Sequence, residues 1–202
     1  PPNYADGSTL KFDTGGSFEI SSVTTIWRPG SSRGVGVPDD ETVASTNPLQ
    51  IFDARDVAGK LTINSSGSVT QGNNVFIVQG DFANSGDYSF VSDGSERLTV
   101  EGKFTNNGTM TLSETGGGDL ELKGDFDNDG TFSDEGRAIF FTGSSTQELN
   151  TISGNFGFLV FNGTGGVKLV SNDVTVEGAN GDVLQFLNSG GLDLNGQTMT
   201  LS

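Results

Sequence analysis

The feature that most constrains this chain is a repeat of 22 residues in its middle. Its three copies are FIVQGDFANSGDYSF from Phe76, LTVEGKFTNNGTMTL from Leu98 and LELKGDFDNDGTF from Leu120. Four kinds of position recur at this spacing: Phe82, Phe104 and Phe126; Asn84, Asn106 and Asn128; Gly80, Gly102 and Gly124; Gly86, Gly108 and Gly130. A period near 20 residues without helical periodicity predicts a solenoid, in which each repeat is one coil stacked on the last.

Within each copy the apolar residues alternate with polar ones. Leu98, Val100, Phe104, Met110 and Leu112 all have the same parity, so in a strand they share one face. Stacked coils would then contain an internal column of Phe rings and a ladder of Asn amides. Gly and Asn fall where the chain must turn, and we expect them there because both tolerate positive φ. The predicted fold is all-β, a right-handed parallel β-helix with coils of about 18–22 residues.

The pattern is weaker on both sides of the three clear copies. GKLTINSSG from Gly59 resembles an earlier copy, and an apolar-x-apolar-x-Gly pattern continues to Gly143, Gly163, Gly178 and Gly196. All five prolines and Trp27 lie in the first fifty residues. We therefore expect an irregular N-terminal cap over residues 1–58 and a solenoid over 59–202, with Trp27 anchoring the cap. Because LDLNGQTMTLS ends within an apolar alternation, we expect more of the same polypeptide, or an identical subunit, to cover that end.

Composition narrows the possible functions. The chain has 31 Gly and only 32% hydrophobic residues, which suits a thin repeated core. It has no Cys and no His, which excludes disulfides, the usual zinc sites and Ser-His catalysis. A net charge of -16 opposes binding to nucleic acid or to an anionic membrane and leaves cations or neutral glycans as ligands. No apolar run approaches the ~18 residues that span a bilayer, so we expect no membrane insertion.

The stretch GDFDNDGTFSDEG, from Gly124, resembles the first half of a calcium loop. Asp125, Asp127 and Asp129 precede Gly130 at alternate positions, and hard oxygens at that spacing can converge on one Ca²⁺. The alternative is a solvated acidic corner, because the two earlier copies form the same turn without three acids. Stacking predicts that Lys103 lies between Asp81 and Asp125 and that Lys123 pairs with Glu101, whereas Asp127 and Asp129 would face no cation.

Catalysis is not expected. Lyases that act on uronates need Lys or Arg near the substrate carboxylate, and the few basic residues beyond residue 58 are scattered. Glycosidases need two carboxylates at a defined separation. Asp39 and Asp40 are adjacent, so in a strand they point to opposite faces. A carbohydrate-binding or polysaccharide-cleaving β-helix therefore remains only as an alternative.

Several stretches of the chain resemble those of a known family. They are the coils VEGKFTNNGTMTL and LKGDFDNDGTF, the stretch from FFTGSSTQEL to VTVEG, the final LDLNGQTMTLS, and the upstream Trp27 with GVGVPDDETV. They resemble the β-helical repeat regions of large surface and adhesin-like proteins of Bacteroidota, exported by type IX secretion. The resemblance implies an extracellular, non-catalytic stalk or adhesin segment, whose partners are the rest of its polypeptide and surface glycans. A self-assembling extracellular filament, built by head-to-tail stacking, is the alternative within the structural class.

Overall fold

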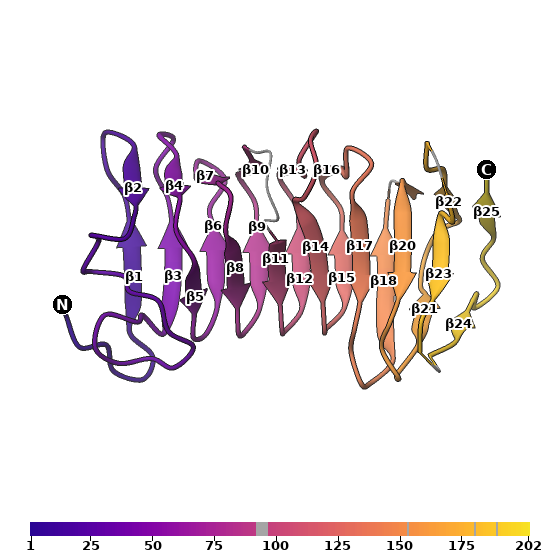
Figure 1. Cartoon of the computed structure of the whole chain (residues 1–202), viewed down its shortest axis with the longest axis horizontal. Helices are drawn as coiled ribbons and strands as arrows, with labels where there is room; N and C mark the ends of the chain where they lie inside the picture. Colours follow the sequence, from indigo (N-terminus) through magenta and orange to yellow (C-terminus); the bar gives the residue numbers. More distant parts are fainter. Residues whose placement is uncertain (92–96, 153, 180, 189) are drawn as a thin grey trace.

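The computed structural model shows an elongated stack of β-coils (Figure 1). It describes residues 1–91, 97–152, 154–179, 181–188 and 190–202. These residues contain no helix, so none is long and apolar enough to cross a membrane. The strands form four sheets, and within each sheet the neighbouring strands pair in parallel. The predicted β-solenoid is therefore confirmed.

The nine-stranded sheet runs the length of the described chain. Its order is β1 (Thr9–Phe12), β3 (Asp40–Val43), β6 (Leu61–Ile63), β9 (Phe82–Asn84), β12 (Phe104–Asn106), β15 (Phe126–Asn128), β18 (Gln147–Thr151), β21 (Val167–Leu169) and β24 (Leu192–Asp193). The seven-stranded sheet consists of β5 (Arg55–Val57), β8 (Val75–Val78), β11 (Arg97–Val100), β14 (Asp119–Leu122), β17 (Ala138–Phe141), β20 (Phe158–Phe161) and β23 (Leu184–Phe186).

The third face is divided between two sheets. The six-stranded sheet consists of β2 (Phe18–Ile20), β4 (Leu49–Ile51), β7 (Ser68–Gln71), β10 (Asp87–Phe90), β13 (Thr109–Thr111) and β16 (Thr131–Ser133). The three-stranded sheet consists of β19 (Asn155–Phe156), β22 (Val174–Val176) and β25 (Met199–Leu201). A full coil therefore takes one strand from each face, as β12, β13 and β14 do.

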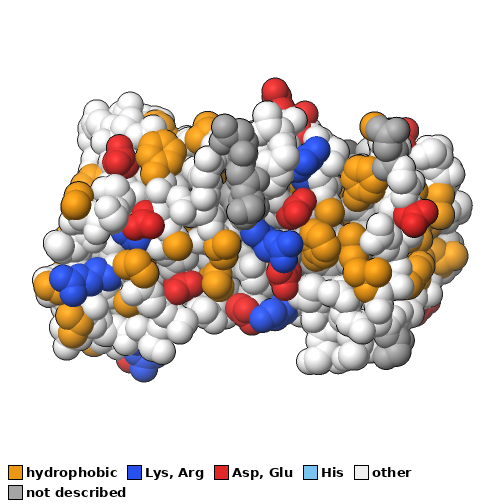
Figure 2. Space-filling model, in the orientation of Figure 1, with side chains coloured by type: hydrophobic (Ala, Val, Ile, Leu, Met, Phe, Trp, Pro, Cys, Tyr) orange, Lys and Arg blue, Asp and Glu red, His pale blue; other side chains and the backbone are white. Residues whose placement is uncertain are grey.

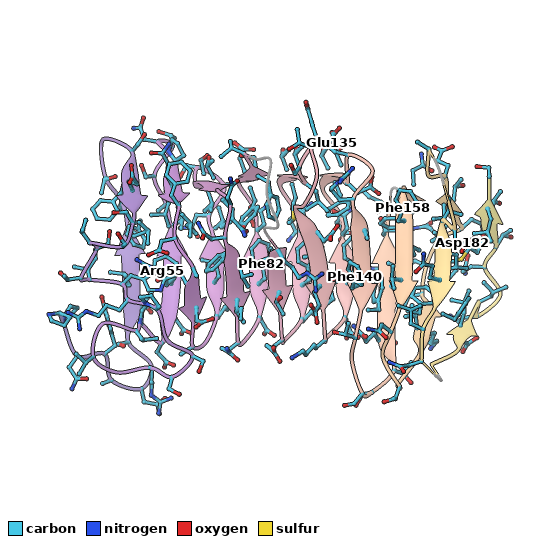
Figure 3. All side chains as sticks on the ribbon, viewed as in Figure 1. Arg55, Phe82, Glu135, Phe140, Phe158 and Asp182 are labelled. Atoms are coloured by element: carbon cyan, nitrogen blue, oxygen red, sulfur yellow. The ribbon has the colours of Figure 1, made fainter. Side chains whose placement is uncertain are left out.

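The interior is filled by columns of side chains that follow the repeat. Phe82, Phe104 and Phe126 lie in register, and consecutive ring centroids are 5.1 Å apart with nearly parallel planes. Phe82 lies within the coil in Figure 3. Alternate residues of β12 and β15 are buried, as a period of two requires. Apolar burial thus holds each coil to the next along the whole rod.

The buried Asn residues form a second column. Asn84 donates from Nδ2 to Oδ1 of Asn106 (2.8 Å), and Asn106 donates in the same way to Asn128 (2.7 Å). The second N–H of Asn84 bonds to the Thr109 carbonyl, and that of Asn106 bonds to the Thr131 carbonyl. The column ends at Thr151, whose Oγ1 accepts from Asn128 (3.3 Å). These bonds satisfy amides that water does not reach.

The six repeat glycines lie at the corners, but the expected positive φ is wrong. None of the six has a φ in the left-handed region. A Cβ on Gly108 would instead lie 2.1 Å from the Gly86 carbonyl oxygen, and one on Gly124 would lie 2.2 Å from that of Gly102. Consecutive coils approach so closely at these corners that only a hydrogen atom fits. Glycine is required by coil-to-coil distance and not by backbone conformation.

The ladder crosses the expected boundary at residue 58 without a break. β3 pairs with both β1 and β6, and β5 pairs with β8, so residues 9–57 share the sheets of the solenoid. Irregular chain is concentrated in residues 21–39. Trp27 is buried there, and its Nε1 donates to the Asp56 carbonyl (2.8 Å) while Nε of the buried Arg55 donates to the Trp27 carbonyl (3.0 Å). Trp27 thus joins the irregular segment to the first coils.

The later coils differ from the spacing inferred from their glycines. Val174–Val176, which precede Gly178, lie in the three-stranded sheet and not in the seven-stranded one. The residue that stacks on Gly163 is Gly190, because a Cβ there would lie 2.2 Å from the Gly163 carbonyl oxygen. Gly178 and Gly196 are therefore not equivalent to Gly143 and Gly163. The coils lengthen here, and the sequence pattern alone does not reveal it.

Candidate functional site

The acidic corner predicted from GDFDNDGTFSDEG lies on β15 and its flanking turns. Asp127 faces outward, where Nζ of Lys103 lies 2.6 Å from its Oδ2 and Nδ2 of Asn150 donates to its Oδ1 (2.8 Å). Asp125 accepts the backbone N–H of Glu148 (2.8 Å), and Asp129 is exposed. Two of the three carboxylates therefore already have protein partners.

The expected partner of Lys103 is corrected by this geometry. Its Nζ pairs with Asp127, which was expected to face no cation, while Asp81 accepts only the backbone N–H of Lys103 (2.8 Å). The side chain reaches diagonally past its ladder neighbour to the next coil. Lys123 does pair with Glu101 (2.6 Å), as stacking predicts. In Figure 2, blue and red side chains adjoin across the middle of the rod.

The pKa values follow these contacts. Partial burial raises the pKa of Asp127, but the hydrogen bonds from Lys103 and Asn150 outweigh it, so the pKa lies below the ordinary value. The hydrogen bond to Asp127 raises the pKa of Lys103. Within the described residues, no group of three or more acidic side chains is arranged to hold a metal ion. Calcium at Asp125, Asp127 and Asp129 stays a prediction.

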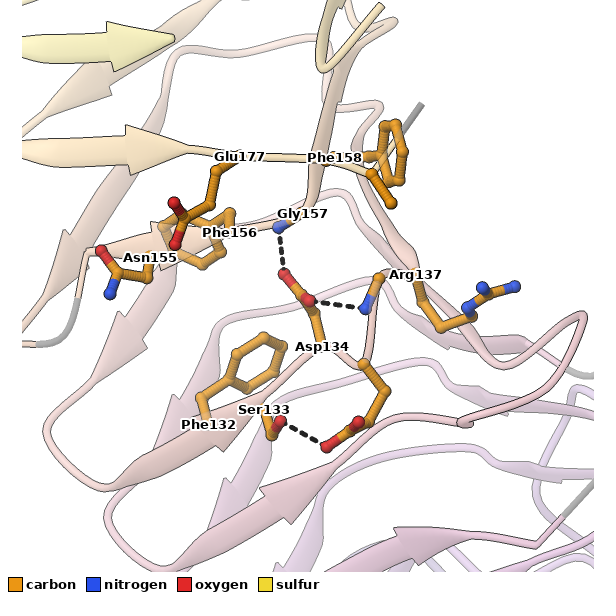
Figure 4. Close-up of a pocket in the computed structure, with 13 residues that line it drawn as sticks. Phe132, Ser133, Asp134, Arg137, Asn155, Phe156, Gly157, Phe158 and Glu177 are labelled. Atoms are coloured by element: carbon orange, nitrogen blue, oxygen red, sulfur yellow. Dashed lines mark hydrogen bonds between the residues drawn. The ribbon is translucent and has the colours of Figure 1, made fainter. Parts of the chain in front are cut away.

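A larger hollow lies where the third face is interrupted. β16 is the last strand of the six-stranded sheet, and β19, in the next coil, pairs only with β22. Between them lies a cleft of about 690 Å³ (Figure 4). Three consecutive coils line it: residues 132–137 from the first, 155–158 from the second and 177–179 from the third. We call this hollow the seam cleft.

Asp134 spans the interruption. Its Oδ1 accepts the Gly136 N–H (2.9 Å) within its own turn, and its Oδ2 accepts the Gly157 N–H (2.5 Å) from the next coil. The turn bends through Glu135 and Gly136, both with positive φ. Glu135 projects from the rim in Figure 3, and the Ser133 hydroxyl donates to its carboxylate (2.6 Å). A side chain thus replaces the missing backbone ladder at this point.

Burial also perturbs the Asp134 carboxyl. Burial raises its pKa above the ordinary value, although the N–H groups of Gly157 and Gly136 act in the opposite direction. A perturbed carboxyl in a cleft is a feature of acid–base sites. Here both oxygens already accept backbone N–H groups, so the geometry assigns Asp134 to holding the turn.

Two charged side chains of the seam cleft have no close polar partner among the described residues, although the charge of Arg137 acts on Asp134 and lowers its pKa. Arg137 and Glu177 lie on opposite walls, and neither forms an ion pair or a side-chain hydrogen bond with a described residue. The Nε–H of Arg137 is buried without an acceptor. Phe132 and Phe158 are partly exposed beside them, and the Phe158 ring lies against Gly178, where a Cβ would be 2.6 Å from ring Cζ. The cleft therefore offers aromatic surface, one donor group and several acceptors.

Comparison with protein-family models, curated proteins and solved structures gave no match to this chain. The seam cleft was not predicted from the sequence, although one signal marks it. The spacing of the corner glycines falls from 22 residues, between Gly102 and Gly124, to 19, between Gly124 and Gly143. The break in the third face falls at the end of the regular period. No pattern, however, identified Arg137, Phe158 or Glu177.

Proposed function

We propose that this chain is a non-catalytic structural segment, a rigid β-solenoid spacer within an extracellular bacterial surface protein. The observation that carries the proposal is the unbroken nine-stranded parallel sheet, with stacked Phe rings and bonded Asn amides beneath it. Bending such a rod would strain backbone hydrogen bonds and side-chain columns together. The fold thus suits separating two points at a fixed distance.

The charged side chains on the surface support the same proposal. Cross-coil ion pairs join Lys123 to Glu101 and Arg97 to Glu121 (2.7 Å), and the Arg97 guanidinium also lies 4.8 Å from the centre of the Phe140 ring. Each exposed pair contributes little alone, about 0–1 kcal/mol. They place opposite charges side by side on adjacent coils, as the stacking of the coils requires. The net charge of -16 keeps separate rods apart.

Stretching a single molecule between two marker domains of known unfolding force tests the spacer. We expect discrete force peaks, with each 22-residue coil releasing roughly 75 Å of chain. Extension without peaks, as for a disordered linker, would contradict the proposal. The extracellular location rests on the resemblance of the coils to exported surface proteins. Antibody labelling of intact source cells, compared with permeabilised ones, tests it separately.

Self-assembly is a second candidate, favoured by exposed apolar side chains on the last coils. Phe186, Leu187, Leu194 and Leu201 are each about half exposed. Stacking of another coil, from a second copy, would cover them. Sedimentation should then show association that rises with concentration, and Leu187→Glu with Leu201→Lys should abolish it. Val91→Lys, at a half-exposed position in mid-rod, is the matched control and should leave association unchanged. Sedimentation as a monomer at every concentration would reject this candidate.

A further inference from the structure

The seam cleft has the dimensions of a ligand site. Its volume of about 690 Å³ falls in the range of ~300–1,000 Å³ that small-molecule sites occupy. It lies at the one place where two sheets of the third face meet without pairing. The lining thus comes from strand ends and turns that are free to carry side chains unrelated to the repeat.

The seam cleft contains one of the few basic side chains of the described chain that lack an ion pair. Most basic side chains of the described chain have a carboxylate within 4.0 Å; Arg55, Arg97, Lys103 and Lys123 are examples. Arg137 does not, although Asp134, Glu135 and Glu177 line the same hollow. Its Nε–H has lost water without gaining an acceptor, which is costly. A ligand that draws this side chain into the cleft would relieve that cost.

The lining also selects the chemistry of the occupant. Three carboxylates against one guanidinium repel an anion, and the overall charge of -16 adds to this. A cation would pair with Glu177 but leave the Arg137 donor unsatisfied. A hydroxyl both donates and accepts, so a ligand rich in hydroxyls can serve Glu177 and Arg137 together. Its C–H faces can rest on the partly exposed rings of Phe132 and Phe158.

We propose that the seam cleft binds a neutral saccharide unit, with Arg137 and Glu177 as its hydrogen-bonding walls and Phe158 as its apolar platform. Figure 4 shows Arg137 and Glu177 on either side of the hollow, with Asp134 between them. The Arg137 guanidinium points away from Glu177 there, so binding requires this side chain to turn towards the ligand. The site adds a recognition point to the rod. It does not depend on the spacer function, because a free or a filament-forming segment would carry the same cleft.

A titration of the isotopically labelled chain by NMR tests the proposal. The probes are neutral oligosaccharides of glucose, galactose, mannose and N-acetylglucosamine, with spermidine and a galacturonate trimer as charged comparators. We expect at least one neutral saccharide to shift amide signals confined to the three lining segments. We expect Arg137→Ala and Glu177→Gln each to raise the Kd of that saccharide at least about tenfold, which corresponds to 1.4 kcal/mol.

The control is Lys60→Ala, which removes another unpaired base at a site remote from the cleft and should leave the Kd unchanged. Glu177 is exposed and Gln has nearly its shape, so this variant should keep the melting temperature of the parent. Three outcomes would overturn the proposal. They are silence towards every neutral saccharide, tighter binding of spermidine or galacturonate, and neutral binding that both cleft variants leave intact.

Discussion

The buried amide of Asn106 bonds to the coil on each side, so removing it should affect both. Asn106→Ala would leave the Asn128 Oδ1 and the Thr131 carbonyl without their donor. We expect the variant to lose about 2–3 kcal/mol of unfolding free energy, because buried acceptors would be unsatisfied. Urea denaturation measures this. The neighbouring Asn107 is exposed, and Asn107→Ala should change stability by less than about 0.5 kcal/mol. Equal stability of the two variants would show that the amide column is not stabilising.

The corner glycines lead to a second residue-level prediction. Gly108→Ala places a Cβ 2.1 Å from the Gly86 carbonyl oxygen, so the coils must separate at that corner. We expect a loss of about 1–3 kcal/mol in unfolding free energy, typical of overpacking. Gly116→Ala is the matched control, because nothing lies within 4 Å of its Cβ position. A melting temperature for Gly108→Ala equal to that of Gly116→Ala would contradict the close-approach explanation.

Glu41 is the residue whose burial is hardest to explain. It faces inward on β3, is 1% exposed, and neither carboxylate oxygen has a hydrogen-bond partner. Burial raises its pKa well above the ordinary value. The parity shared with Val43 could have revealed an inward acid, because alternate residues of a strand share a face. The repeat pattern points to acids at the turns, and it gives no sign of one inside a coil.

This carboxyl predicts a specific dependence of stability on pH. Above the unfolded pKa of about 4.3 and below the raised folded value, the folded chain retains a proton that the unfolded chain has lost. The stabilising effect of Glu41 is therefore complete below the unfolded pKa and is lost as pH rises, at about 1.4 kcal/mol per pH unit. Glu41→Gln should remove this part of the slope in urea denaturation at several pH values. Identical slopes for the parent and the variant would show that Glu41 is ionised in the folded chain.

At the scale of elements, the strands were predictable and the interruption between them was not. The order of β9, β12 and β15 follows from a fixed period and a parity, which depend only on residue type and spacing. The separation of β16 from β19 depends on how one turn packs, since Asp134 takes the place of the ladder there. When a side chain takes the place of a backbone ladder in this way, the sequence shows no periodic signal of it. For the same reason the spacing of Gly178 and Gly196 does not predict their places in the coils.

The turn that follows β15 is also where the calcium prediction can be tested. Asp127 is held by Lys103 and Asn150, so Ca²⁺ would have to displace an ion pair of 2.6 Å to bind it. If the corner nevertheless binds, Ca²⁺ should raise the melting temperature over that measured with a chelator. Asp127→Thr with Asp129→Asn, which restores the residues of the preceding coil, should abolish that rise. Equal melting with Ca²⁺ and with chelator would leave a corner that uses its acids only for pairing.

At the scale of the molecule, each coil depends mainly on its two neighbours. The stacked rings, bonded amides and closely spaced corners all join one coil to the next. In such a solenoid, stability is approximately a sum over coils and the interfaces between them. Coils of equal length and register should then be interchangeable. The three 22-residue copies allow this to be tested directly.

Deleting residues 104–125 removes one coil and joins Lys103 to Phe126. Phe126 would then stack on Phe82 and Asn128 would bond to Asn84, because the register of both pairs is preserved. We expect a folded rod, shorter by about 4.8 Å in X-ray scattering, with one cooperative melting transition. Deleting only residues 104–114 is the control. Its odd length turns inward side chains outward and places one face over another, so it should not fold. If the two deletions are equally disruptive, contacts beyond the neighbouring coils must determine the fold. If only the deletion of residues 104–114 prevents folding, the interfaces between adjacent coils are sufficient to build the rod.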